Sequence, residues 1–330
     1  MTAVYITIDT EYSSGLAARQ GLASRQDFAS RKHNFARSIA CETPEGAVGI
    51  AYQMDVFDRH GLKAVFFVDP MPALVWGTEA IADIVGPIVA RGHDVQLHLH
   101  TEWLELAGPA NPLKGKTGLN IKDFTFDEQC FLLDHARQVL MAAGAPRPTA
   151  FRAGNYGASD DTLRALAHLG FTHETSHCPG ISGSHCAISL TPADRRPLAH
   201  MGLVEVPIGC IASFGGALRH AQITALSAGE MLAAIRHAQA CGLSAFTLVS
   251  HSFEFLSRDR TRINHILKRR FEAFCAGLAR LPGATSATYA AQPPSAAPSP
   301  ALAPILPLGL ARTGLRLAEQ LVANRLYGAR

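Results

Sequence analysis

The sequence predicts an α/β protein, a distorted (β/α) barrel of seven to eight strand–helix units. Two observations favour this fold class. Short apolar, β-branched runs alternate with longer stretches that carry helix-capping and helix-ending residues, an order typical of a parallel sheet covered by helices. The alternation continues over about 290 of the 330 residues, and seven or eight such units favour a barrel over an open sheet.

The first five elements illustrate the pattern. Residues 3–8 are apolar and β-branched, so they predict a strand almost at the start of the chain. A helix follows at 47–60, then a strand at 63–68 with the sequence Lys-Ala-Val-Phe-Phe-Val. A second helix at 78–91 leads into a strand at 93–97. Each of these helices ends at a glycine, the residue that most readily adopts the left-handed conformation of a helix C-cap.

The later elements continue the same alternation. Two of the helices begin with capping boxes, Thr-Phe-Asp-Glu and Ser-Ala-Gly-Glu, which satisfy free backbone N–H groups at a helix start. In chain order the expected elements are a helix at 125–143, a strand at 149–151, a helix at 159–170, a strand at 204–207, a helix at 227–242, a strand at 245–249, a helix at 260–281 and a final strand at 284–289. Together these elements form a catalytic domain over 1–290.

Two segments stand outside this alternation. Residues 12–46 form a long polar insertion, which is either a lid or cationic wall for an anionic substrate, or a solvated loop. Its cations are Arg19, Arg25, Arg31, Lys32 and Arg37. Residues 291–307 are rich in Pro and Ala and predict an extended linker. The linker leads to a basic amphipathic helix over 308–330, whose residues 308–326 contact an anionic membrane surface, a partner protein or their own domain.

Composition narrows the function classes. Apolar residues make up 48% of the chain and charged residues 17%, which suffices for a sizeable core. The net charge is only +3 without any block of like charges, so no nucleic-acid partner is expected. No apolar run reaches the ~18 residues that span a bilayer. Because the N-terminus lacks a secretory signal and the seven cysteines form no C-x-x-C pair, we expect a cytoplasmic protein with reduced thiols. Its C-terminal helix offers a means of association with a membrane.

Polar side chains gather where the predicted strands end. In a parallel α/β barrel the carboxyl ends of the strands meet on one face, and chemistry collects there. The residues at these positions are Asp9 and Glu11 after the first strand, His98, His100 and Glu102 after the third, Arg152 after the fourth and His251 after a late strand. Trp103 follows them closely and either packs in the core or stacks on a sugar.

This set of residue types points to metal-assisted hydrolysis of an amide or ester. Two histidines and a carboxylate suit a catalytic Zn²⁺ site that keeps one position open for water. Of the two acids after the first strand, one can bind the metal while the other takes a proton from water. His251 is placed to protonate a leaving group, and Arg152 can orient a carboxylate.

Over residues 1–290 the chain resembles the polysaccharide deacetylase family, carbohydrate esterase family 4. Thr7-Ile8-Asp9-Thr10 is similar to the first family motif and aligns Asp9 with the catalytic base. Thr10 replaces the metal-binding Asp of the family, so the resemblance makes Glu11 the candidate ligand. His98 matches the first histidine of the second motif, while the second ligand is either His100 or Glu102.

The other motifs are matched in part. Arg152 corresponds to the family arginine that holds the base, and a backbone N–H near Tyr156 corresponds to the oxyanion site. His251 falls on the histidine that serves as the general acid. The fourth motif has no convincing counterpart, and Glu174 is its nearest polar candidate.

The resemblance implies a function and leaves two alternatives. It implies a hydrolase that depends on a divalent metal, with Zn²⁺ favoured, and removes an acetyl group from an N-acetylated sugar or polysaccharide precursor. The departures from the motifs are similar to those of bacterial members in lipopolysaccharide or exopolysaccharide synthesis. The first alternative is a metal-independent cyclic amide hydrolase on the same fold, similar to allantoinases. The second is an inactive sugar-binding or scaffold protein.

Overall fold

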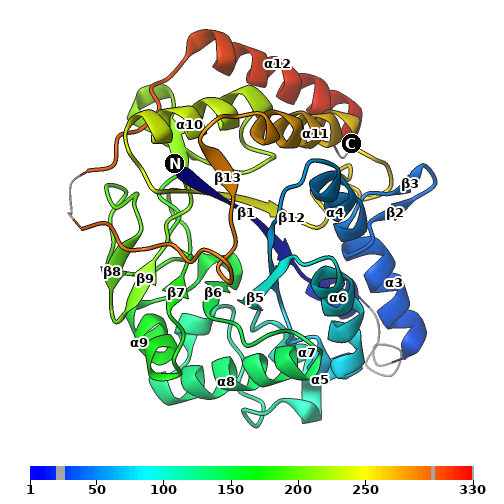
Figure 1. Cartoon of the computed structure of the whole chain (residues 1–330). Helices are drawn as coiled ribbons and strands as arrows, with labels where there is room; N and C mark the ends of the chain where they lie inside the picture. Colours follow the sequence, from blue (N-terminus) through cyan, green and yellow to red (C-terminus); the bar gives the residue numbers. More distant parts are fainter. Residues whose placement is uncertain (20–26, 299–301, 329–330) are drawn as a thin grey trace.

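One sheet of mostly parallel strands curls around the centre of the protein (Figure 1). A computed structural model describes residues 1–19, 27–298 and 302–328. The strands run in the order β12 (Ala245–His251), β1 (Thr2–Thr10), β4 (Val65–Val68), β5 (Asp94–Leu99), β6 (Ala150–Ala153), β7 (His173–Glu174), β9 (Leu203–Glu205) and β8 (Leu198–His200). Only β8 is antiparallel to its neighbour, and β13 (Ala284–Ser286) pairs with the first residues of β1.

Irregular contacts take the place of regular pairing between the two sides of the curled sheet. Gly209, in the segment after β9, donates its backbone N–H to Thr247 of β12 over 2.9 Å. Val249 of β12 donates in turn to Ala221 over 2.9 Å. The intervening residues form a small hairpin of β10 (Cys210–Ala212) and β11 (Leu218–His220). The predicted distorted (β/α) barrel is therefore confirmed.

The predicted helices of the barrel are all present, although the last one, predicted from residue 260, begins at His265. They are α4 (Ile50–Arg59), α6 (Thr78–Ala90), α8 (Phe126–Ala142), α9 (Asp160–His168), α10 (Ala228–Ala240) and α11 (His265–Ala279). Both capping boxes are present, at the starts of α8 and α10. Short α-helices at Ala73–Trp76 (α5) and Trp103–Ala107 (α7), and single 3₁₀ turns at Gly108–Ala110, Ile121–Asp123, Gly154–Tyr156 and Phe214–Gly216, complete the connections.

Alternation along β1 separates the barrel interior from the layer beneath the helices. Val4 and Ile6 belong to the large core between sheet and helices, whereas Ala3 and Tyr5 belong to a smaller interior cluster. Since side chains on a strand alternate between faces, the interior face of β1 continues from Tyr5 to Asp9. The same periodicity on the other strands directs their last residues into the barrel mouth.

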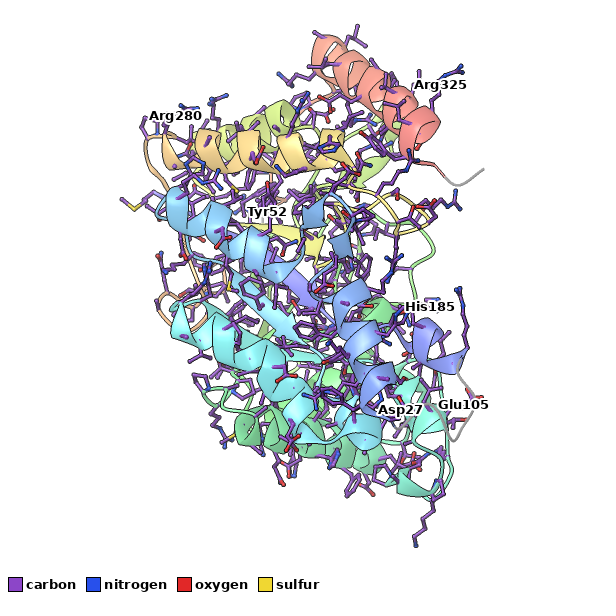
Figure 2. The ribbon with its side chains drawn as sticks, turned by 90° about the vertical axis from the view of Figure 1, so that its right-hand side faces the viewer. Asp27, Tyr52, Glu105, His185, Arg280 and Arg325 are labelled. Atoms are coloured by element: carbon purple, nitrogen blue, oxygen red, sulfur yellow. The ribbon has the colours of Figure 1, made fainter. Side chains whose placement is uncertain are left out.

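The described parts of the insertion 12–46 contain regular structure in place of a solvated loop. They form α1 (Ser14–Ala18), α3 (Phe28–Ser38) and a hairpin of β2 (Glu42–Thr43) and β3 (Gly46–Ala47), and α3 lies along one side of the barrel near the labelled Asp27 in Figure 2. The inner face of α3 is polar, because its buried residues are Ser30, Asn34 and Ser38. A polar inner face gives no apolar periodicity, which explains why the sequence did not predict this helix. Arg25 lies outside the described residues.

The Pro-rich segment is extended, as its composition indicates, but it is bound to the barrel. Tyr5 donates its hydroxyl to the carbonyl of Gln292 over 2.6 Å. His173 Nε2 lies 2.9 Å from the carbonyl oxygen of Pro294, and Arg195 donates to the carbonyl of Ala303 over 2.9 Å. These contacts hold the described parts of 291–307 against the barrel, so these parts do not form a free linker.

The C-terminal helix α12 (Leu310–Tyr327) packs on α10 through charged residues (Figure 1). Arg316 donates to Glu230 of α10 over 3.2 Å, and both side chains are at most 2% exposed. Arg270 of α11 also donates to Glu319 over 2.7 Å. Removing one partner of the buried Arg316–Glu230 pair costs about 3–5 kcal/mol, so this pair holds α12 on α10. Within the described residues, no helix combines the length and apolarity needed to cross a bilayer.

Candidate active site

The strand register brings the predicted strand-end residues together. Asp9 of β1 pairs with His251 of β12, and His98 of β5 pairs with Arg152 of β6. All four lie on the interior side of their strands at the carboxyl ends. These residues are up to 242 positions apart in the sequence (from 9 to 251), so only the curled sheet makes them neighbours.

Three of the predicted metal ligands converge on one point. Glu11, His98 and His100 each offer a ligand atom, and these atoms lie within 4.8 Å of one another. Glu11 Oε2 is 2.5 Å from His100 Nε2 and 3.5 Å from His98 Nε2. Burial opposes ionisation of Glu11, but the charge of His100 outweighs it and holds the Glu11 pKa well below its usual value.

The outer nitrogen of each imidazole is held by a neighbour. His98 Nδ1 donates to the backbone carbonyl of Arg152 over 2.8 Å. His100 Nδ1 lies 3.1 Å from a carboxylate oxygen of Glu102. Hydrogen bonds at Nδ1 direct Nε2 of each ring toward Glu11, which is the usual arrangement around metal-binding histidines. Glu102 therefore orients His100 and stands outside the three-residue cluster.

The residues of this cluster fit a divalent metal of the Zn²⁺ type. Two imidazole nitrogens and one carboxylate oxygen are a ligand set of catalytic zinc sites, which keep a fourth position for water. Glu11 Oε2 is buried and accepts no hydrogen bond in the described structure, although two ring nitrogens face it. A cation at the centre would satisfy this carboxylate oxygen and both Nε2 lone pairs at once.

A glycine makes room for His100. A Cβ placed on Gly154 would lie 2.7 Å from His100 Nδ1 and 2.8 Å from two ring carbons, closer than a real Cβ approaches its neighbours. The backbone of Gly154 needs no left-handed conformation, so an added methyl group acts on the imidazole and not on the chain. This close approach links the end of β6 to the orientation of a metal-ligand candidate on β5.

We expect Gly154→Ala to weaken metal binding about 10–100-fold, the usual cost of disturbing the support of a ligand. The methyl group would push the His100 ring away from Glu11. Metal affinity measured by competition with a chelator checks this, with Gly229→Ala on α10 as the control because a Cβ there meets nothing within 4 Å. Equal metal affinity in the two variants would contradict the orientation described for His100.

Asp9 and Arg152 form a buried ion pair beside the cluster. Arg152 Nη1 donates to Asp9 Oδ1 over 2.6 Å, and Arg152 Nε donates to the carbonyl of Thr175. The guanidinium also lies 4.5 Å from the ring centroid of Phe67, which fixes its plane. The second carboxylate oxygen of Asp9 faces His251, at 3.9 Å from Nε2. Arg152 thus orients Asp9 with one oxygen toward the site.

His251 is paired with an acid that the sequence interpretation missed. Its Nδ1 lies 2.9 Å from Glu254, and Glu254 also accepts hydrogen bonds from Ser250 and from the amide of Gln222. Burial opposes protonation of His251, but Glu254 and Asp9 outweigh it and raise its pKa to about 9. The imidazolium therefore persists at neutral pH with Nε2 facing the site. The only sequence signal for Glu254 is its spacing, three residues after His251 in a loop.

We expect Glu254→Gln to shift the alkaline limb of kcat to lower pH by about 1–2 units. A general acid must be protonated, so activity falls as pH rises through the pKa of His251. The pKa is about 9 with the carboxylate present and falls without it, which moves the loss of activity toward neutrality. A pH–rate profile checks this, with the exposed Glu105→Gln as control. An unchanged alkaline limb would contradict the assignment of His251 as the general acid.

Asp69 is a second buried acid near the site that the sequence interpretation did not assign. It directly follows β4, and its Oδ1 accepts from the backbone N–H groups of Met71 and His100, at 3.1 and 3.4 Å. Oδ2 is buried with no hydrogen-bond partner in the described structure, and burial raises the Asp69 pKa to about 7. The alternation of Val65, Phe67 and Asp69 was the signal, since it places all three on the interior face.

The remaining predicted residues divide between the site and the core. Tyr156 follows Asn155 in a turn where both have a left-handed backbone, a strained conformation common at functional sites. Trp103 is completely buried and packs on Trp76 with ring centroids 5.2 Å apart, so it takes the core position that the sequence left open. Glu174 is also fully buried and accepts a hydrogen bond from Ser176, away from the cluster.

Two hollows adjoin these residues. A small one of about 90 Å³ is lined by Glu11, His100 and Glu102. A larger groove of about 880 Å³ is lined by His251, Glu254 and residues of α12. Arg260 lines both hollows. Because residues of α12 line the larger groove, the C-terminal helix forms one wall of the groove that contains His251. Three potential metal ligands, a paired acid and a paired histidine around an open groove are suited to hydrolysis.

Comparison with known proteins supports the fold. No family model and no curated protein sequence matches this chain. Among solved structures, a Mycobacterium smegmatis protein assigned to the polysaccharide deacetylases superposes with a TM-score of 0.53, at 17% identity over 88% of this chain and 87% of its own. A family 4 carbohydrate esterase from Streptomyces lividans, in complex with acetate, gives a TM-score of 0.42 at 13% identity over 87% and 92%.

A third structure shows that this architecture is shared more widely. The 4-α-glucanotransferase of Thermococcus litoralis has a TM-score of 0.50 at 9% identity, over 88% of this chain and 39% of that one. Fold alone therefore leaves the reaction open, and function has to be argued from the site. The chain has the fold of the polysaccharide deacetylases, the family that its sequence motifs resemble.

Proposed function

We propose that this protein is a metal-dependent hydrolase that removes an acetyl group from an N-acetylated sugar. One observation supports the proposal above all others: Glu11, His98 and His100 converge beside the Asp9–Arg152 and His251–Glu254 pairs. The set contains a metal cluster, a carboxylate to accept a proton and an imidazolium to return one. The fold shared with a polysaccharide deacetylase agrees with this reaction class.

Each side chain has a defined task in this reaction. Glu11, His98 and His100 would hold a divalent metal, which would supply Lewis-acid chemistry to water and to the amide carbonyl. Asp9 Oδ2 accepts the proton of the attacking water, while Arg152 holds Oδ1 so that the carboxylate keeps one orientation. The new C–O bond forms as the carbonyl carbon becomes tetrahedral.

His251 completes the cycle. Its Nε2 donates a proton to the amine as the C–N bond breaks, and Glu254 steadies the imidazolium before transfer. Acetate and a free amino sugar leave. The backbone N–H groups near Tyr156 lie at the carboxyl end of β6, where they could stabilise the oxyanion through hydrogen bonds. We further propose that the substrate is a precursor of a cell-surface polysaccharide.

The decisive experiment measures acetate release from a panel of N-acetylated saccharides. We expect turnover that is lost after treatment with a chelator and restored by Zn²⁺. Allantoin serves as the cyclic amide in the same assay, because the alternative enzyme class needs no metal. Turnover of allantoin by metal-free protein, without acetate release from any sugar, would contradict the proposal. A protein inactive on every substrate but able to bind sugars would favour the scaffold alternative.

We also propose that the outer face of α12 lies on an anionic membrane surface. The helix buries the polar residues Thr313 and Arg316 and exposes its leucines, the reverse of an ordinary surface helix. Seven of the 14 exposed large apolar residues in the described structure are Leu302, Leu310, Leu315, Leu317, Leu321, Val322 and Leu326. So dense an apolar surface is typical of an interaction site.

Charge selects the membrane as the partner. Residues 226–330 contain twelve Lys and Arg against five Asp and Glu, a net charge of +7, whereas residues 1–225 contain 18 against 22, a net charge of −4. Arg325 points away from the body of the protein in Figure 2. An apolar helix face with basic flanks is typical of helices that lie in the membrane interface.

Flotation with vesicles tests this contact. We expect the protein to float with vesicles containing anionic lipid and not with purely zwitterionic ones. Leu317→Gln with Leu321→Gln should weaken binding about tenfold or more, whereas Phe131→Gln with Met141→Gln on α8 should not. No flotation with anionic vesicles, or a dimer in solution that the α12 variant dissociates, would contradict the membrane contact.

A further inference from the structure

Four arginines from two distant segments line one hollow next to the candidate active site. Arg19 and Arg37 come from the insertion 12–46, and Arg258 and Arg260 come from the turn between β12 and α11. The hollow has a volume of about 450 Å³, and Asp259 is the sole acid that lines it among the described residues. The helical insertion therefore places part of its positive charge opposite a second basic loop.

These arginines have no carboxylate partner in the described part of the chain. Within the described residues, none of these four arginines forms an ion pair. By contrast, the neighbouring Arg31 is paired with Asp83 of α6. Asp259 is engaged by Ser257 and Thr261. Burial lowers the pKa of Arg260, against the opposing charges of Cys41 and Glu11, and the charges of Arg37 and Arg19 lower it further.

Arg260 connects the cationic hollow to the predicted chemistry. It lines this hollow, the small hollow that contains Glu11 and His100, and the groove that contains His251. Its guanidinium lies 4.3 Å from the ring centroid of Phe253, a cation–π contact that holds it at the edge of the hollow. An anion held by the four arginines would therefore adjoin the site of amide hydrolysis.

We propose that this four-arginine cluster binds a phosphate or diphosphate group of the substrate. The substrate is then an N-acetylated glycosyl phosphate or diphosphate, whose acetamide reaches the Glu11–His98–His100 cluster. Guanidinium groups match phosphate oxygens through paired, charge-assisted hydrogen bonds, and several of them together suit a group with more than one negative charge. This inference rests on the proposed function for its substrate, but the anion site can be tested without turnover.

Binding of pyrophosphate, measured by calorimetry, tests the anion site alone. We expect saturable binding by the wild-type protein that weakens with added salt, as an exposed ionic contact must. Arg37→Gln with Arg258→Gln should weaken it about tenfold or more, since each charge-assisted hydrogen bond contributes on this order. Lys32→Gln is the matched control, because Lys32 is on the same helix and does not line the hollow. Absent binding, or equal losses in both variants, would overturn the inference.

Kinetics test whether this anion belongs to the substrate. The substrates are N-acetylglucosamine, its 1-phosphate, its uridine diphosphate conjugate and a short prenyl diphosphate conjugate. We expect the ratio of kcat/KM for phosphorylated over neutral sugar to fall about tenfold in the double variant, through KM and not kcat. The conjugate with the highest ratio identifies the source of the phosphate as soluble nucleotide or lipid. A ratio near one in the wild-type protein would overturn the inference.

The two proposals fail in different ways. If pyrophosphate binds through Arg37 and Arg258 but no sugar releases acetate, the anion site is supported and the proposed deacetylase function is contradicted. If neutral and phosphorylated sugars release acetate equally well and pyrophosphate does not bind, the deacetylase function is supported and the anion site is contradicted.

Discussion

Asp9→Asn is expected to lower kcat for acetate release by about 10²–10⁴-fold, the range contributed by a positioned general base. An amide cannot accept the proton of the attacking water, although it keeps the size of the carboxylate. Substrate binding should change little, because Asp9 lies below the groove in a buried pair with Arg152. Steady-state kinetics at saturating substrate measure the effect, and the exposed Asp161→Asn is the matched control.

Stability has to be followed in the same experiment. The substitution leaves the Arg152 guanidinium buried without its ionic partner, which costs about 3–5 kcal/mol of unfolding free energy. Activity is therefore measured well below the melting temperature, and bound metal serves as the indicator of an intact site. Wild-type kcat in a folded, metal-loaded Asp9→Asn protein would eliminate Asp9 as the base.

His98→Ala is expected to remove the metal and with it all turnover. It deletes one of three ligand atoms that lie within 4.8 Å of one another, at a position fixed by the carbonyl of Arg152. We expect metal content to fall from about one ion per chain to near zero, since a pair of ligands rarely retains a catalytic zinc ion. Elemental analysis of the purified protein measures it, with His60→Ala outside the site as control.

The Glu102→Gln variant tests whether Glu102 orients His100 or binds the metal itself. The structure places Glu102 behind His100 and outside the ligand cluster, so its loss should weaken metal binding only about 10–100-fold. Metal content at high metal concentration should remain near one ion per chain. Undiminished metal content in His98→Ala, or complete loss in Glu102→Gln, would require a different ligand set.

Much of the fold could be predicted because the local signals agreed with one another. The apolar β1 segment, the capping boxes of α8 and α10, and the glycines that end helices are all encoded within a few residues. The positions of Asp9, His98, Arg152 and His251 at strand ends predicted that they belong to the active site. The parallel register of the strands makes them neighbours. Local pattern and global topology gave the same result at these positions.

The parts that escaped prediction depend on contacts between distant segments. The helix α3 buries Ser30, Asn34 and Ser38, so its inner face has no apolar pattern to detect. Similarly, α12 docks through the buried pair of Arg316 and Glu230, whereas its sequence left open whether the helix contacts a membrane, a partner protein or its own domain. Glu254 lies in a loop, where spacing carries little information until the chain folds back onto His251.

The choice between His100 and Glu102 shows the same limit at a single site. Both follow β5 within a few residues, and both residue types bind divalent metals. Alternation places His98 and His100 on the interior face, but the roles depend on which atom of His100 meets Glu11. The ring of His100 occupies the space above Gly154, which turns Nε2 toward Glu11 and Nδ1 toward Glu102.

The most direct test of the central claim is a crystal structure of the zinc-loaded protein with anomalous data collected at the zinc edge. We predict one strong peak about 2.0–2.2 Å from a carboxylate oxygen of Glu11 and from Nε2 of His98 and His100, with Glu102 beyond ligand distance. Absence of a peak among these three residues in active protein, or a peak ligated by Glu102 in place of His100, would contradict it.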